Sequence, residues 1–148
     1  MTRLKDEIAN NTHSFFINKL PELLAFAGCH EDVLLSGHDF SEPKVSSTKK
    51  NSAETIIFRV DSARIMLDAV KDTLNSMNET ERKVIEYCYF NHLRIFEIAI
   101  RLNCSERLVS IYKNKALKNF APRFIAMQVK NGIDEKNIFD LTKIKEVA

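Results

Sequence analysis

Apolar residues recur three and four positions apart through most of the chain, which is the spacing of amphipathic helices. Residues 3–26 show it first, and we expect Pro21 to divide them into two helices, because proline is best tolerated at a helix start. Gly28 is expected to end the second of these helices. Residues 28–52 have no apolar period and predict a long loop.

Residues 53–77 give the clearest helical signal. Their apolar positions alternate in steps of four and three and form a heptad seam from Ile56 to Met77. The seam predicts either a coiled coil with a second copy of the chain or packing against the apolar residues of 3–26. The second interpretation is favoured, because the seam is short and includes the small Ala63.

Three further helices are expected in the second half of the chain. Asn78 can cap the first, which extends to about Phe90, and Glu81 can reach back to complete a capping box. A short helix over 95–102 and a longer one from 106 to about 120 follow. Pro122 lies near the end of the last helix, although the helical pattern can resume beyond it, as far as Gly132.

The helices at 95–102 and 106–120 together predict a helix-turn-helix. Only Asn103 and Cys104 separate the first helix from Ser105, which can cap the second. So short a connection requires small and branched residues where the helices cross. The sequence provides them as Ile98, Ala99, Leu102, Val109, Tyr112 and Ala116.

This buried face directs polar and basic side chains of the second helix outward, where a recognition helix meets the major groove. Arginine and asparagine can each bond a base edge through two hydrogen bonds, and serine and lysine can contact phosphates, but all are also ordinary surface residues. Glu106 can accept from a cytosine amino group or can simply suit the positive end of the helix dipole. The candidate DNA-binding residues are Arg94, Ser105, Glu106, Arg107, Ser110, Lys113, Asn114, Lys115 and Lys118.

The charge distribution favours a polyanionic partner. The whole chain has a formal net charge of only +2, from 22 basic and 20 acidic residues. Residues 77–124 hold nine basic and five acidic side chains, whereas residues 1–40 hold three and six. With only 3 glycines and 3 prolines, the composition also argues against a turn-rich β fold and against glycine-rich phosphate loops. We therefore expect an all-α helical bundle with a C-terminal helix-turn-helix.

Catalytic and metal-binding patterns are not recognisable in the sequence. Cys29, His30 and His38 lie near two aspartates, but their spacing matches no zinc site. The 3 cysteines have no C-x-x-C spacing and suit reduced thiols in the cytoplasm. No apolar run approaches the roughly 20 residues of a membrane span. We expect neither an enzyme nor a cofactor, a metal or a membrane partner.

The block from Leu74 to Phe120 resembles region 4 of sigma-70 family factors. That region has the pattern E-R-x-V, an aromatic pair, E-I-A-x-x-L, S-x-x-x-V and A-L. The matching stretches here are 81–84, 89–90, 97–102, 105–109 and 116–117. The chain departs from the pattern at Asn103 and Cys104, where glycine and a branched residue are usual, and at Arg94, where a serine or threonine cap is usual.

Most of residues 15–121 is similar to the ArpU family of phage regulators, through the helix that begins near Glu54 and the ending 112–121. The resemblance implies a transcriptional regulator, typically of late phage genes in Gram-positive hosts, whose helix 106–118 reads a promoter element. It also implies a protein that lacks a promoter-melting region and does not initiate transcription alone.

The predicted organisation has four parts: N-terminal helices and loop 1–52, connecting helix 53–77, helix-turn-helix domain 78–124 and tail 125–148. The expected partners are double-stranded DNA, RNA polymerase and a second copy bound through 56–77 or through the tail. Two other functions stay open. One is the small subunit of a phage packaging terminase, and the other is a helix-turn-helix that binds protein instead of DNA.

Overall fold

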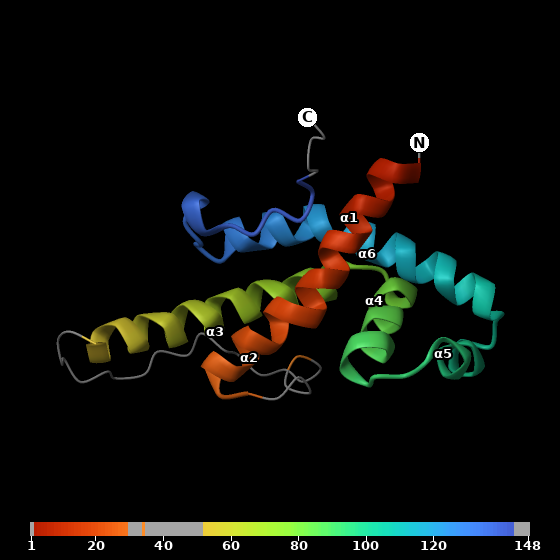
Figure 1. The fold of residues 1–148 in the computed structure, drawn as a ribbon, viewed down its shortest axis with the longest axis horizontal. Coiled ribbons are helices and arrows are strands. Elements are labelled where there is room, and N and C mark those ends of the chain that lie inside the picture. Colours follow the sequence, from red (N-terminus) through yellow and green to blue (C-terminus); the bar gives the residue numbers. More distant parts are fainter. Residues whose placement is uncertain (1, 30–33, 35–51, 144–148) are drawn as a thin grey trace.

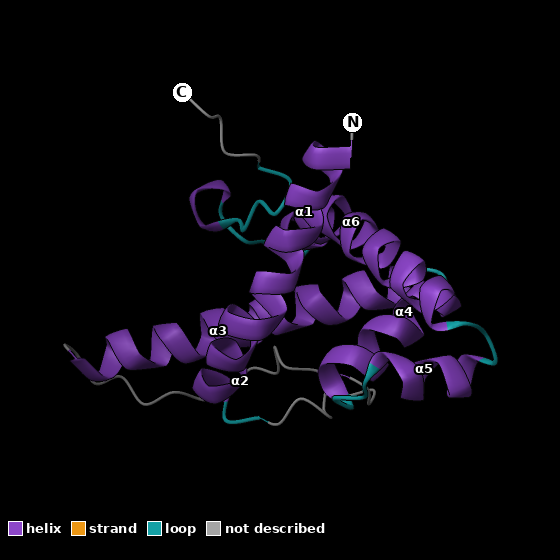
Figure 2. Ribbon diagram, turned by 45° about the vertical axis from the view of Figure 1, so that its right-hand side comes forward, coloured by secondary structure: helices purple, strands orange, loops and turns teal. Residues whose placement is uncertain are grey.

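The computed structural model describes residues 2–29, 34 and 52–143, and these residues form helices and connections without a β-strand (Figures 1 and 2). The all-α prediction is therefore confirmed. The loop expected at 28–52 lies largely outside the described residues, as do His30 and His38. The helices are α1 (Thr2–Ser14), α2 (Leu20–Ala27), α3 (Ser52–Ser76), α4 (Glu79–Ile85), α5 (Ile95–Leu102) and α6 (Glu106–Lys130). Two π-helical turns, η1 (Phe15–Lys19) and η3 (Glu86–Phe90), extend α1 and α4, and a 3-10 turn covers Glu135–Asn137.

The two N-terminal helices, α1 and α2, are joined by the π-turn η1 without an intervening loop. Proline has no N–H to donate to the carbonyl four residues back, and the wider π-turn η1 directly precedes Pro21. In that turn the Leu20 N–H donates to the carbonyl of Phe15. Pro21 thus lies in the first turn of α2, as expected, and the π-turn η1 joins α2 to α1 where a gap could have formed. Gly28 ends α2 as expected, in the left-handed conformation with φ 69°.

The heptad seam of α3 packs within the chain. Ala63, Leu67, Val70, Leu74 and Met77 are buried in the core that α3 shares with α2 and α6. The structure thus agrees with the intrachain interpretation for these residues, while a dimer through residues 56–77 stays a prediction. The side chain at the beginning of the seam, Ile56, lies outside the described residues.

Aromatic side chains join the N-terminal helices to the helix-turn-helix. The Phe16 ring stacks on Tyr89 with centroids 4.8 Å apart and lies 4.9 Å from Phe120. Phe124 lies 5.2 Å from Phe120 and 5.0 Å from Phe15. Such pairs stabilise a core beyond the area that they bury. We call these five residues the aromatic core; they tie η1, η3 and the middle of α6 together.

Asn78 caps α4 as expected, because its Oδ1 accepts from the Glu81 N–H at 2.9 Å. The reciprocal half of the expected capping box is wrong. The Glu81 carboxylate is buried and accepts instead from Nδ2 of Asn119 on α6, at 2.8 Å. The Glu81 carboxylate thus forms a hydrogen bond between α4 and α6 instead of capping its own helix.

Helix α6 passes through Pro122 without a break and continues to Lys130. The expected end near residue 120 is wrong, whereas the expected continuation toward Gly132 is confirmed. The 25 residues make a rod of about 37 Å at 1.5 Å per residue. Pro122 is exposed, while Phe120 and Phe124 on either side are fully buried. Core packing therefore outweighs the local cost of the proline, and α6 runs through the boundary expected at 124.

The tail returns across the N-terminal helices. The buried Gln128 side chain pairs with the backbone of Phe139, donating from Nε2 at 2.9 Å and accepting at Oε1 at 2.8 Å. Asn11 of α1 donates to the carbonyls of Leu141 and Lys143 at 3.1 and 2.8 Å. The described part of the tail, up to Lys143, is thus docked on its own chain, while its use as a contact with a second copy stays a prediction. Residues 144–148 lie outside the described part.

Candidate nucleic-acid interface

The turn of the helix-turn-helix depends on Asn103, which ends α5 in the left-handed conformation with φ 55° and ψ 50°. Asparagine tolerates this region better than most residues with a side chain. The next residue, Cys104, donates its N–H to the Ala99 carbonyl at 3.0 Å and so satisfies one of the last carbonyls of α5. Asn103 thus does here what glycine usually does at such a turn, and the predicted turn is confirmed.

Two different devices begin the two helices. Ser105 Oγ accepts from the Leu108 N–H at 3.1 Å and caps α6, as expected. Arginine has no acceptor and cannot cap, so at the start of α5 the Glu97 carboxylate accepts from the backbone N–H of Arg94 at 2.9 Å. Arg94 is exposed, and its guanidinium forms no ion pair with another described residue.

A small apolar cluster holds the two helices together. Ile98 and Ala99 of α5 and Val109 of α6 are buried, with Ile98 and Val109 at 0% exposure. We call these three residues the helix-turn-helix core. All three were predicted at the crossing, and half-buried side chains surround them: Tyr87, Cys88, Leu93, Ile95, Leu102 and Cys104.

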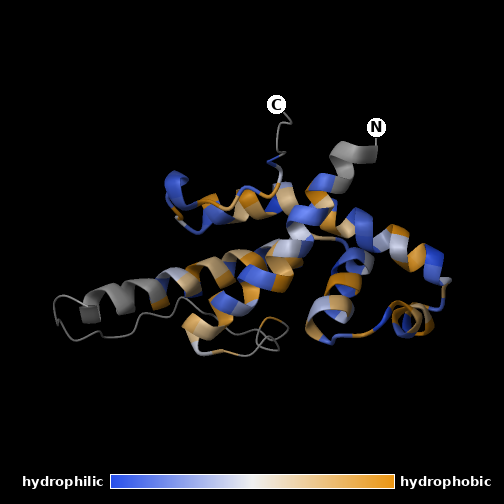
Figure 3. Ribbon diagram, in the orientation of Figure 1, coloured by the Kyte–Doolittle hydropathy of each residue, from blue (hydrophilic) through white to orange (hydrophobic). Residues whose placement is uncertain are grey.

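The first half of α6 presents a polar and basic stripe to solvent. Arg107, Ser110, Asn114 and Lys118 follow one another at steps of three and four, so they share one helix face. We call these four residues the outer stripe. Arg107 and Ser110 are exposed and the other two are half-buried; Ser105, Glu106 and Lys115, beside the stripe, are exposed. Figure 3 shows hydrophilic and hydrophobic positions alternating along this helix.

Three cations of this surface form no ion pair with an acid in the described ranges. The ion pairs between described residues join Lys19 to Glu22, Arg82 to Glu86 and Lys83 to Glu79. Arg107, Lys115 and Lys118 have no acidic partner in the described part of the chain. Their positive charge is therefore available to an anionic ligand.

Lys113 lies on the flank of α6, not on the outer face where the sequence placed it. Its Nζ is 5.6 Å from the centre of the Tyr89 ring, a cation–π arrangement. The Tyr89 hydroxyl shares a 2.6 Å hydrogen bond with Nδ1 of His13 on α1. Burial and the nearby Lys113 charge lower the pKa of His13, and burial raises the pKa of Tyr89. Lys113 thus connects the helix-turn-helix to the N-terminal helix.

Sequence reasoning missed one residue of the exposed face. Ile111 is 51% exposed and lies four residues after Arg107 and three before Asn114. Ile111 was not predicted on this face because an apolar residue in a helix is ordinarily assigned to the core. Its spacing could have revealed it, since the same steps of three and four place Ile111 beside the outer stripe.

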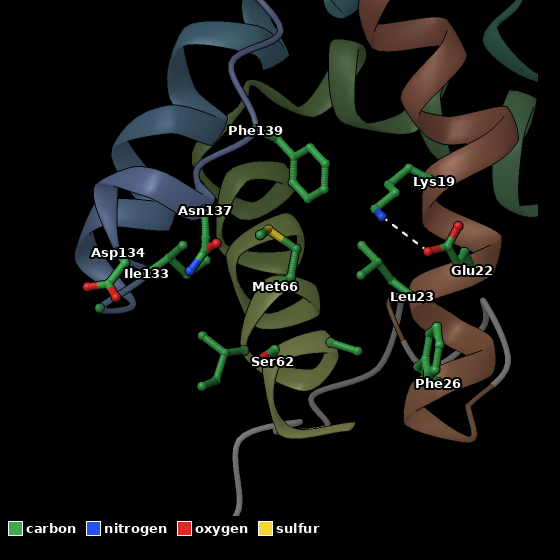
Figure 4. A pocket seen from close by; sticks show the side chains of 13 residues that line it. Lys19, Glu22, Leu23, Phe26, Ser62, Met66, Ile133, Asp134, Asn137 and Phe139 are labelled. Atoms are coloured by element: carbon green, nitrogen blue, oxygen red, sulfur yellow. Dashed lines mark hydrogen bonds and ion pairs between the residues drawn. The ribbon is translucent and has the colours of Figure 1, made fainter. Parts of the chain in front are cut away.

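No metal site is found at this surface among the described residues. The described residues contain no group of three histidine, cysteine or acidic side chains able to hold a metal ion, and Cys29, Cys88 and Cys104 are free thiols. A groove of about 580 Å³ lies elsewhere, between α2, α3 and the turn after α6 (Figure 4). Phe26, Met66 and Phe139 line it beside the Lys19–Glu22 ion pair. Within the described ranges, no helix is long and apolar enough to cross a membrane.

Residues 67–120 match the family described as Sigma-70, region 4. The matched segment begins in α3, includes α4, α5 and the outer stripe, and ends inside α6. It agrees with the resemblance seen between Leu74 and Phe120, so a helix-turn-helix of sigma-70 region 4 type is confirmed. A search of curated proteins and a search of solved structures each found no significant match.

Proposed function

We propose that this protein is a sequence-specific DNA-binding regulator of transcription that grips duplex DNA with α5 and the first half of α6. The observation that carries the proposal is the outer stripe: a row of polar and basic side chains, unpaired by acids, on the second helix of a region 4 helix-turn-helix. Helix N-termini and exposed cations are the features that position such a helix on phosphates.

The residues divide into two roles. Arg107 and Asn114 face outward from the first half of α6, where a recognition helix meets base edges, and each can form two hydrogen bonds to one base. Lys115, Lys118 and Arg94 supply charge to phosphates on either side. Glu106 can accept from a cytosine amino group, so it belongs to the proposed reading surface.

The resemblance to the ArpU family supports a narrower proposal, namely a regulator of late phage genes that acts in the cytoplasm beside RNA polymerase. One recognition helix reads few base pairs, so two copies are expected on one site. Since the seam residues Ala63, Leu67, Val70, Leu74 and Met77 are buried within the chain, a dimer contact through α3 would use other residues of this helix. The proposed function does not require a cofactor or a catalytic residue.

The full chain should be tested against a random duplex library at two salt concentrations, with its mass measured by light scattering. We expect enrichment of a short site by a monomer or dimer and an affinity that falls steeply with salt. Ring-sized assemblies would instead favour a packaging terminase subunit. Absence of binding at low salt would leave a protein-binding module.

Two variants separate the proposed roles. Arg107→Ala should relax specificity at one or two base positions at a cost of about 1–3 kcal/mol, as expected for a lost base contact. Lys118→Ala should weaken all sequences alike and reduce the salt slope by about 1. Lys136→Ala, an exposed lysine in the 3-10 turn, is the matched control and should change neither quantity. Equal and uniform losses in Arg107→Ala and Lys118→Ala would refute the assignment of roles.

A further inference from the structure

Ile111 is an apolar side chain that lies outside both apolar cores. It is 51% exposed, whereas its neighbours on the buried face of α6, Val109 and Ala116, are both at 0%. It belongs neither to the helix-turn-helix core nor to the larger core around the aromatic residues. Single exposed apolar residues are common on protein surfaces, so the informative observation is the place of Ile111 on α6 and not its exposure alone.

The position of Ile111 relative to the outer stripe indicates a role in binding. At about 100° per residue, Ile111 lies roughly 40° around the helix from Arg107, 60° from Asn114 and 20° from Lys118. An apolar group thus lies beside side chains that suit base edges and phosphates, with the half-buried Leu108 on its other side. The matching ligand surface is anionic at its borders and carries an apolar group between hydrogen-bonding atoms. In the major groove of DNA, that apolar group is the 5-methyl of thymine.

We infer that Ile111 is a specificity-determining residue that contacts the 5-methyl group of a thymine while Arg107 and Asn114 bond the neighbouring base edges. The inference rests on the proposed DNA-binding function and names part of the sequence that the site must contain. An A·T pair with its thymine methyl facing α6 is required within the selected site.

The test removes the same methyl group from the DNA and its partner from the protein. Each thymine of the selected site is replaced singly by deoxyuridine, which keeps base pairing and lacks only the methyl, and the affinity of the full chain is measured by fluorescence anisotropy. One thymine should stand out, with a loss of about three- to five-fold, as expected for one buried methyl. Ile111→Ala should lower affinity for the intact site by a similar factor and should lose nothing further at that deoxyuridine.

Ile100→Ala is the matched control, because Ile100 is another isoleucine of the helix-turn-helix and is 74% exposed, but on α5. It should keep the full deoxyuridine penalty. Alanine is a good helix former, so neither variant should disturb folding, and circular dichroism will verify this.

Three results overturn the inference: a selected site without an invariant thymine, no deoxyuridine penalty at any position, or an undiminished penalty in Ile111→Ala. In each case salt-dependent binding to a selected site would still support the proposed function. Failure of the full chain to bind any duplex would refute the function itself, and the inference with it.

Discussion

The aromatic core and the helix-turn-helix core are built on very different scales, although α6 runs through both. The first packs five large rings from η1, η3 and α6 against one another, and α3 supplies further buried residues around them. The second has Ile98, Ala99 and Val109 as its buried side chains. The surface proposed to read DNA is therefore the lightly held part of the molecule, and its rigidity depends on the helix that it shares with the larger core.

The largest expected effect is the loss of a ring from the aromatic core. Phe120→Ala should lower the free energy of unfolding by about 3–5 kcal/mol, because Phe120 is fully buried between Phe16 and Phe124. Urea denaturation followed by circular dichroism measures it. Phe96→Ala, at a residue that is 48% exposed on α5, is the control and should cost less than about 0.5 kcal/mol. Comparable losses in the two variants would contradict the difference between the regions.

A cavity in the smaller core should have a local effect. Ile98→Ala should lower the free energy of opening of α5 and the beginning of α6 by about 2–4 kcal/mol, because Ile98 is fully buried there. Hydrogen exchange should show faster exchange confined to these helices, with α3 still protected. The control is Leu67→Ala, a cavity in α3 that should speed exchange across the whole molecule. Uniform deprotection in Ile98→Ala would mean that the two cores unfold as one.

The cap of α6 should have a smaller effect. Ser105→Ala removes the acceptor for the Leu108 N–H and should destabilise the start of α6 by about 1 kcal/mol. Amide exchange at Leu108 is the direct measurement. Ser110→Ala, at an exposed serine within the same helix, should leave that amide unchanged. An unaltered Leu108 amide in Ser105→Ala would show that the cap does not stabilise this end.

The smallest effect concerns His13, which contacts both regions through Tyr89 and lies near Lys113. Its pKa is lowered from 6.5 in the folded protein, so the unfolded chain takes up a proton more readily. The free energy of unfolding should therefore fall as pH drops below about 6.5, and the fall should be smaller in His13→Gln.

NMR titration should also show the His13 pKa moving toward its ordinary value in Lys113→Gln, because a positive neighbour is removed. An unchanged pKa in that variant would rule out the coupling.

Local rules predicted the helix-turn-helix well because its determinants are local. The Ser105 cap, the left-handed Asn103 and the spacing of Ile98, Ala99 and Val109 each act within a few residues. From these features the bounds of α5 and the start of α6 could be predicted. The helix face that carries Arg107 and Ser110 could then be predicted as well. The family resemblance pointed to the same segment.

The predictions that failed depend on contacts between residues that are distant in the sequence. Pro122 was expected to end a helix, but Phe120 and Phe124 are held by partners from η1 that local rules do not include. Lys113 was expected to face outward, but the ring of Tyr89 lies beside it only after η3 has folded against α6. A pattern on one helix cannot show which neighbour will lie over its flank.

The matched family segment stops at Phe120, yet α6 continues for ten more residues to Lys130. A boundary drawn from sequence similarity would therefore cut a single rod in two and remove Phe124 and Gln128 from a unit that needs them. The region is recognisable by its sequence, but we expect the segment 67–120 not to fold as a separate unit. Exchange of such regions between regulators, in evolution or by engineering, would have to include the second half of α6 and the helices that enclose it.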